Sequence, residues 1–300
     1  MPGVRRAALA GALLVVLGAC SAGPSGDPGP VSTSGGAPPA ERVHVSLGDS
    51  YATGYRPADA GEPAGSAPGF ADLVAERSDL RLINFACSGA TSAQLRSEAG
   101  CDPDARAVGA PDPAGRTQLD AAVEALREHQ GRVGLVTVVI GGNDLTPCAR
   151  EADPLTCATR AVADVRANLA ATLPVLREAA GDAPIVGLTY PDVFLGAWVS
   201  TEFPNGRDLA QLSVSLFRDF FNNALKAEYE QVGAKFVDVT EATGGYGPLS
   251  EVTDDPTYGR IPASVAKICA LTYFCRYTDV HPTPEGHEEI ADAVLAATGR

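Results

Sequence analysis

Short apolar runs alternate with segments of helical periodicity along most of the chain. Runs rich in aliphatic and β-branched residues are typical of buried strands, and apolar residues spaced three or four apart are typical of helices. The pattern predicts five strands, over residues 43–47, 82–85, 133–140, 185–189 and 235–239. Helical periods cover residues 117–129, 158–180, 207–232 and 284–297. This alternation predicts an α/β domain with three α/β/α layers, built on a doubly wound parallel sheet of about five strands.

Three segments interrupt the pattern with little periodicity, over residues 55–69, 97–115 and 240–261. Irregular segments of this length in a compact domain are usually functional loops. We therefore expect them to frame a substrate cleft.

The N-terminal residues differ from the rest of the chain. Arg5 and Arg6 precede an apolar run over residues 7–19, which is too short to span a bilayer but has the form of a secretory signal. The run ends in Leu-Gly-Ala-Cys, which resembles the lipobox of bacterial lipoproteins. Residues 1–19 are therefore predicted to be a signal peptide, and Cys20 the lipidated first residue of the mature chain. The alternative is a plain secretory signal that leaves Cys20 as a spare thiol.

The segment after Cys20 has a composition that cannot bury enough apolar surface to fold. Residues 21–40 include five Pro, five Gly and four Ser. We expect residues 20–41 to form the lipidated cysteine with a flexible tether, and residues 42–300 to form the folded domain. The lipid would hold this domain close to a membrane.

The negative net charge argues against some classes of binding partner. The chain carries 37 acidic and 23 basic residues, a net charge of −14, and loss of residues 1–19 removes two of the basic ones. Nucleic acid is an unfavourable partner for such a surface, because phosphate binding requires Lys and Arg. Electrostatic docking to anionic lipid is equally unfavourable, so the lipid anchor would have to supply membrane proximity. We expect a monomer.

Six of the seven cysteines remain when Cys20 is set aside. They fall along the chain as three pairs of near neighbours, although fifteen pairings are formally possible and the sequence alone does not choose among them. Export favours disulfides over metal sites, and no pair has the Cys-x-x-Cys spacing of a zinc site. The expected bridges are Cys87–Cys101, Cys148–Cys157 and Cys269–Cys275.

Polar residues follow the predicted strands at the edge of the sheet where ligands of open parallel sheets bind. Taken singly, each has a structural explanation as a helix cap, a turn residue or a surface residue. Together, a hydroxyl, a glycine amide, an asparagine amide and an imidazole are the groups that acyl transfer requires. These residues are Ser50, Gly89, Asn143 and His281.

A serine hydroxyl is a poor nucleophile at neutral pH, so it needs a base within hydrogen-bond reach, and histidine suits that task. We predict that Ser50 is the nucleophile and His281 its base. The oxyanion of the tetrahedral intermediate needs fixed donors, which the Ser50 amide, the Gly89 amide and the Asn143 side chain can supply. Structural or surface roles are expected for the other histidines, His44, His129 and His287.

Four blocks carry these residues in order: GDSYATG, NFACSGAT, GGND and DVHPTPEGH. They resemble the blocks of the SGNH hydrolase family, also called GDSL esterases and lipases, over residues 43–298. The resemblance implies a flavodoxin-like fold and the roles already given for the four residues. The sequence is also similar to the secreted, three-disulfide members, which supports the expected bridges. An α/β-hydrolase is disfavoured because the second glycine of a Gly-x-Ser-x-Gly elbow is missing.

The sequence departs from the family pattern beside His281. The family places an Asp three residues before the His, but here that residue is Thr278, and Asp279 stands two before. Either Asp279 orients the imidazole, or the carbonyl of Thr278 does so in a Ser-His dyad. Both would fix the tautomer through an acceptor at Nδ1.

The expected function is hydrolysis of small-molecule or lipid esters through an acyl-enzyme, by an exported, envelope-anchored serine esterase or lipase that uses no cofactor or metal. One alternative is transfer of the acyl group to a sugar or alcohol. The other is a non-catalytic lipoprotein that binds a glycan or lipid.

Overall fold

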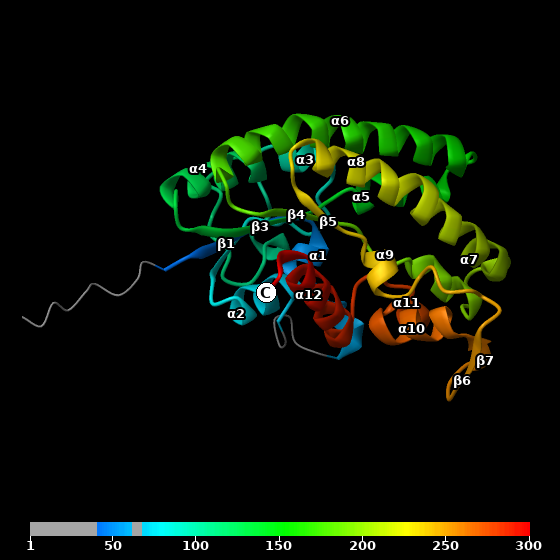
Figure 1. The fold of residues 1–300 in the computed structure, drawn as a ribbon. Helices are drawn as coiled ribbons and strands as arrows, with labels where there is room; N and C mark the ends of the chain where they lie inside the picture. Colours follow the sequence, from blue (N-terminus) through cyan, green and yellow to red (C-terminus); the bar gives the residue numbers. More distant parts are fainter. Residues whose placement is uncertain (1–40, 62–67) are drawn as a thin grey trace, which may run out of the picture. The chain divides into compact units, whose positions relative to one another are not determined.

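Five parallel strands form the central sheet of the protein, in the order β2-β1-β3-β4-β5 (Figure 1). Every residue of β1 and β3 is buried, as continuous apolar runs predict for a sheet covered on both faces. The winding changes direction between β1 and β3, which is where doubly wound sheets bind ligands. The strands are β1 (Val43–Gly48), β2 (Arg81–Asn84), β3 (Val133–Val139), β4 (Ile185–Leu188) and β5 (Lys235–Val237).

This computed structural model describes residues 41–61 and 68–300. The described residues belong to one compact unit. The predicted signal peptide, Cys20 and all of the predicted tether except residue 41 lie outside the described residues. Within the described part of the chain, no helix has the length and apolarity needed to cross a membrane.

Helices cover both faces of the sheet, which confirms the predicted three-layer α/β fold (Figure 1). The layer drawn at the top contains α3 (Ser92–Ser97), α4 (Gln118–Glu128), α6 (Pro154–Ala180) and α8 (Asn223–Gln231). The layer below the sheet contains α2 (Phe70–Arg77) and α12 (Pro284–Thr298). The remaining helices are α1 (Ser50–Thr53), α5 (Gly142–Leu145), α7 (Gly206–Ser215), α9 (Val239–Ala242), α10 (Ala263–Leu271) and α11 (Phe274–Tyr277).

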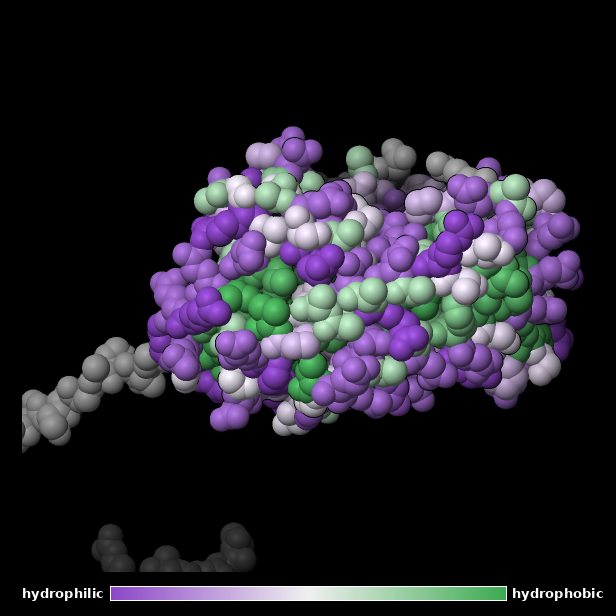
Figure 2. Space-filling model, turned by 90° about the horizontal axis from the view of Figure 1, so that it is seen from above, coloured by the Kyte–Doolittle hydropathy of each residue, from purple (hydrophilic) through white to green (hydrophobic). Residues whose placement is uncertain are grey.

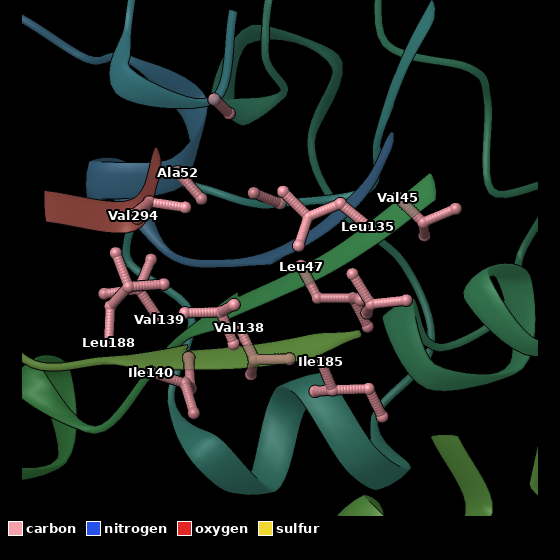
Figure 3. Close-up of a cluster of buried hydrophobic side chains, with 14 of the residues drawn as sticks. Val45, Leu47, Ala52, Leu135, Val138, Val139, Ile140, Ile185, Leu188 and Val294 are labelled. Carbon is pink, nitrogen blue, oxygen red and sulfur yellow. The ribbon is translucent and has the colours of Figure 1, made fainter. Parts of the chain in front are cut away.

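Aliphatic side chains of β1, β3 and β4 form the centre of the core (Figure 3). Ala52 of α1 and Val294 of α12 pack into the same cluster. On the opposite side of the sheet, α6 buries one face, made of Val162, Val165, Leu169, Leu173 and Leu176. The face of the molecule seen from above is mostly hydrophilic, with smaller hydrophobic patches between the hydrophilic residues (Figure 2).

Two segments differ from the prediction. The helical stretch over 207–232 is divided, because a π-helical turn (Leu216–Asn222) separates α7 from α8. The segment 240–261, predicted to be irregular, contains an antiparallel hairpin of β6 (Val252–Asp255) and β7 (Gly259–Pro262). Asp255 caps the hairpin turn by accepting hydrogen bonds from the backbone amides of Thr257 and Tyr258. The strands are too short and polar to show a hydrophobic period.

All three expected disulfides are present: Cys87–Cys101, Cys148–Cys157 and Cys269–Cys275. The first closes the loop after β2, the second joins the segment after α5 to α6, and the third joins α10 to α11. Loops of this size stabilise the fold by about 2 to 3 kcal/mol each in the chain-entropy model.

The burial of His44 in the central sheet should make the stability of the protein depend on pH. It is fully buried in β1, and its Nε2 lies 2.8 Å from the Thr137 hydroxyl of β3. Burial lowers the pKa of His44 to about 3, so the folded protein keeps it neutral while the unfolded chain takes up a proton as the pH falls below 6.5. This difference in proton binding lowers the free energy of unfolding by about 1.4 kcal/mol per pH unit.

Replacing His44 with Gln, which does not titrate, should remove this dependence. Between pH 7 and pH 5 the wild type should lose about 2 kcal/mol more unfolding free energy than His44→Gln, measured by urea denaturation. An equal loss in both proteins would contradict the neutral state of His44 in the fold.

Candidate active site

Ser50 begins the short helix α1 directly after β1. Gly48 ends the strand with a φ of 143°, and a Cβ there would lie 2.1 Å from the Val139 carbonyl oxygen, so only glycine fits. Asp49 is the helix cap, since its carboxylate accepts the Tyr51 amide at 3.0 Å. The Ser50 hydroxyl is therefore not used as the cap.

His281 reaches Ser50 from 231 residues further along the chain, and its Nε2 lies 2.7 Å from Ser50 Oγ. Asp279 Oδ1 lies 2.8 Å from the imidazole Nδ1 and also accepts the His281 backbone amide at 2.9 Å. An acceptor at Nδ1 selects the tautomer that leaves Nε2 free to take the Ser50 proton. Of the two acceptors considered, the structure thus places Asp279, and not the Thr278 carbonyl, at Nδ1.

Backbone geometry explains how an Asp only two residues before His281 reaches its imidazole. Thr278 ends α11 in the left-handed conformation, with a φ of 55°. The chain therefore turns sharply before Asp279 and folds the carboxylate back over the imidazole.

The partial burial of Asp279 by itself raises the pKa of its carboxyl. Hydrogen bonds from His281 and the charge of its imidazolium outweigh burial, so the pKa lies below its ordinary value. Asp279 is therefore ionised at neutral pH.

The expected oxyanion donors lie on the loops after β1, β2 and β3. Gly89 has a left-handed φ of 83°, and within the described part of the chain neither its amide nor the Ser50 amide makes a hydrogen bond. The Asn143 side chain donates to the Ala90 carbonyl at 3.0 Å. One of its two amide hydrogens is then used for orientation, and the other is left for an oxyanion.

These loops are joined by side chains. Asp144 accepts both the Ser92 hydroxyl at 2.6 Å and the Ser92 amide at 2.9 Å, which links the β2 and β3 loops. The hydroxyls of Thr53 and Ser88 lie 2.9 Å apart and link the β1 and β2 loops. The donors are consequently held in place before any substrate binds.

Two tyrosines at the site carry hydrogen bonds that the sequence analysis missed. The Tyr190 hydroxyl follows β4, donates to Asp49 at 2.5 Å and accepts the Gly142 amide at 3.0 Å. The Tyr51 hydroxyl donates to the Val280 carbonyl at 2.5 Å, beside His281. A signal for Tyr190 exists in the sequence, because it directly follows a predicted strand at the same edge of the sheet.

The other three histidines, His44, His129 and His287, are buried, and their hydrogen bonds are to residues outside this site. In the described ranges, no group of three or more His, Cys, Asp or Glu is placed to hold a metal ion.

A serine, an imidazole and a carboxylate in one hydrogen-bonded chain, at the switch point of a doubly wound sheet, are the arrangement of a serine hydrolase. The chain belongs to the GDSL-like lipase/acylhydrolase family, whose model matches residues 46–289. The matched range contains Ser50, Gly89, Asn143, Asp279 and His281.

Comparison with solved structures finds matches at low sequence identity, and the first two described below share the fold. An extracellular lipase from Streptomyces rimosus is 20% identical with a TM-score of 0.50, and the match covers 85% of this chain and 99% of the lipase. A Bacillus subtilis protein is 14% identical with a TM-score of 0.51, covering 87% of this chain and 56% of that protein. Phospholipase A1 from Streptomyces albidoflavus is 18% identical with a TM-score of 0.49, and the match covers 86% of this chain and 100% of the phospholipase. A search of curated proteins finds no match.

The placement of Asp279 predicts that Asp279→Ala lowers kcat for ester hydrolysis at least about 100-fold, because the imidazole loses the acceptor that fixes its tautomer. Steady-state kinetics with a soluble p-nitrophenyl ester measures this. Asp254→Ala, which removes an exposed carboxylate on β6, is the matched control and should leave kcat unchanged. A loss of only a few-fold in Asp279→Ala would favour the Thr278 carbonyl instead.

Proposed function

We propose that this protein is an exported serine esterase or lipase that hydrolyses carboxylic esters through an acyl-enzyme on Ser50. The observation that carries the proposal is the 2.7 Å contact between Ser50 Oγ and His281 Nε2, with Asp279 on the other imidazole nitrogen. Membership of the GDSL-like lipase/acylhydrolase family supports the same reaction class.

Each group has a defined role in this reaction. His281 Nε2 removes the Ser50 proton while Oγ attacks the ester carbonyl carbon, and Asp279 stabilises the imidazolium that forms. When the tetrahedral intermediate collapses, the imidazolium gives its proton to the departing alkoxide, which leaves as the alcohol. Water then attacks the acyl-enzyme, His281 takes a water proton, and that proton returns to Ser50 as the carboxylic acid is released.

The oxyanion of both intermediates would be held by the Ser50 amide, the Gly89 amide and the Asn143 side chain. Prearranged donors are effective because they do not have to reorganise as charge develops, and losing one costs about 100 to 1000-fold in rate. The hydrogen bond from Asn143 to the Ala90 carbonyl supports this role, because it fixes the side-chain amide in advance.

The rim of the site suits an ester with an apolar portion. The Tyr55 ring is 42% exposed and lies 4.4 Å from the His281 ring, centroid to centroid. Val280, also exposed, precedes His281 on the same loop. A hydrocarbon group of the substrate would bury part of this surface.

Export is supported by the three disulfides, which form and persist in oxidising compartments. The lipid anchor at Cys20, the signal peptide over residues 1–19 and the monomeric state stay predictions. The domain boundary at residue 42 also stays a prediction.

A fluorophosphonate probe tests whether Ser50 is nucleophilic. The wild type should be labelled and Ser50→Ala should not, as read by in-gel fluorescence and by mass spectrometry of the modified peptide. Ser97→Ala removes an exposed serine hydroxyl that bonds only within its own helix, and this variant should label like the wild type. An unlabelled wild type would favour the non-catalytic binding protein.

Product analysis separates hydrolysis from acyl transfer. With p-nitrophenyl esters from acetyl to palmitoyl, the free acid should be the main product both in buffer and with an added sugar or alcohol. Chromatography of the products measures the ratio. Formation of a new ester as the main product would instead identify an acyltransferase.

A further inference from the structure

Tyr190 occupies a position from which it contacts two of the catalytic loops at once. Its hydroxyl donates to Asp49 Oδ2 at 2.5 Å, and Asp49 caps the helix that begins with Ser50. The same hydroxyl oxygen accepts the backbone amide of Gly142 at 3.0 Å, and Gly142 immediately precedes Asn143. One oxygen atom therefore joins the nucleophile loop to the loop of an oxyanion donor.

The Tyr190 ring is fixed by its surroundings. Tyr190 is 7% exposed, and its ring makes an edge contact with Tyr51 at 4.9 Å and a stacked contact with Phe221 at 6.3 Å. Gly142 is pressed against the ring, because a Cβ at that position would lie 3.0 Å from it. The hydroxyl consequently has little freedom to seek other partners.

The Asp49 carboxylate completes the link. One oxygen accepts the Tyr51 amide and the other accepts the Tyr190 hydroxyl, and both hydrogen bonds favour the ionised carboxylate. Asp49 is fully enclosed, and burial raises its pKa to about 6 against the opposing hydrogen bonds from Tyr190 and Tyr51.

Other titratable groups also face Asp49. The charge of His281 lowers the Asp49 pKa and that of Asp144 raises it, while the phenols of Tyr51, Tyr190 and Tyr229 surround the carboxylate. The Tyr190 hydroxyl and the backbone amide of Tyr51 are the two groups whose hydrogen bonds lower the Asp49 pKa.

We propose that Tyr190 is a positioning residue that holds the Asn143 turn in register with Ser50 through Asp49, so that nucleophile and oxyanion donor keep one fixed separation during the reaction. The inference rests on the proposed function of Ser50 and Asn143. It adds a role for the strand β4, which supplies none of the catalytic groups.

Tyr190→Phe tests the link, because it keeps the ring and removes only the hydroxyl. A loosened donor turn should lower kcat about 10 to 100-fold with KM nearly unchanged, since small displacements of catalytic groups are costly in the transition state. Asp49 also loses a donor to its charged form, so its pKa rises and the acid limb of the kcat/KM profile should move to higher pH.

Two further variants make the result specific. Tyr246→Phe is the matched control, because the Tyr246 hydroxyl also donates to a carboxylate, that of Asp238, at 2.7 Å; it should leave kcat and the pH profile unchanged. Asp49→Asn removes the titrating group and should lower kcat by itself. Adding Tyr190→Phe to Asp49→Asn should then produce no shift of the acid limb.

The outcomes are separable from a failure of the proposed function. Fluorophosphonate labelling and turnover of the wild type, absent in Ser50→Ala, establish the nucleophile independently of Tyr190. Given that, a Tyr190→Phe protein with wild-type kcat and an unmoved acid limb would overturn the inference, even if its melting temperature fell. Should Tyr190→Phe not fold, a wild-type kcat in Asp49→Asn would overturn it.

Discussion

The hydrogen bond between Ser50 and His281 joins the first strand of the sheet to the loop before the last helix, and the chemistry requires these two elements to be held together. Packing does this at two levels. Ala52 of α1 and Val294 of α12 share the central core (Figure 3). Nearer to the reacting atoms, the Tyr51 hydroxyl binds the Val280 carbonyl. The 2.7 Å contact therefore depends on the core packing and on the Tyr51 hydrogen bond, which hold the two elements together.

The topology of the sheet explains why the other catalytic groups lie at one edge. Parallel strands end on the same side of their sheet, so the loops after β1, β2 and β3 lie close to one another. Side-chain bonds such as Ser92 to Asp144 and Asn143 to Ala90 then fix the loops to one another. The oxyanion hole is preorganised, because these loops lose their conformational entropy during folding and not during the reaction.

The five strands and the layered fold could be predicted from the sequence, because buried parallel strands and amphipathic helices such as α6 have strong periodic patterns. The residues of the first three blocks could also be predicted as a set, since each block follows a strand, whereas His281 lies in the loop between α11 and α12. The π-helical turn and the β6–β7 hairpin could not, because neither changes the hydrophobic period.

Side-chain partners were less accessible from the sequence. Whether Asp279 or the Thr278 carbonyl meets His281 depends on one left-handed residue, which no local pattern at Thr278 indicates. Tyr190 looks like an ordinary core aromatic until its hydroxyl is seen between Asp49 and Gly142. The roles of Asp279 and Tyr190 depend on contacts between loops that are distant in sequence. Local secondary-structure propensity carries no information about such contacts.

The buried carboxylate at the site also has a thermodynamic consequence. Asp49 has a folded pKa near 6 against an ordinary value of 3.8, so the folded state binds the proton more tightly and stability falls as the pH rises through this range. The loss amounts to about 3 kcal/mol at neutral pH. Buried neutral His44 and His287, each with a pKa lowered to about 3 by burial, act in the opposite direction as the pH falls below 6.5. An asparagine at position 49 would avoid the cost but would lose an acceptor-only group that receives both Tyr51 and Tyr190. The buried Asp49 carboxylate therefore lowers the free energy of unfolding at neutral pH, while its hydrogen bonds fix the nucleophile loop.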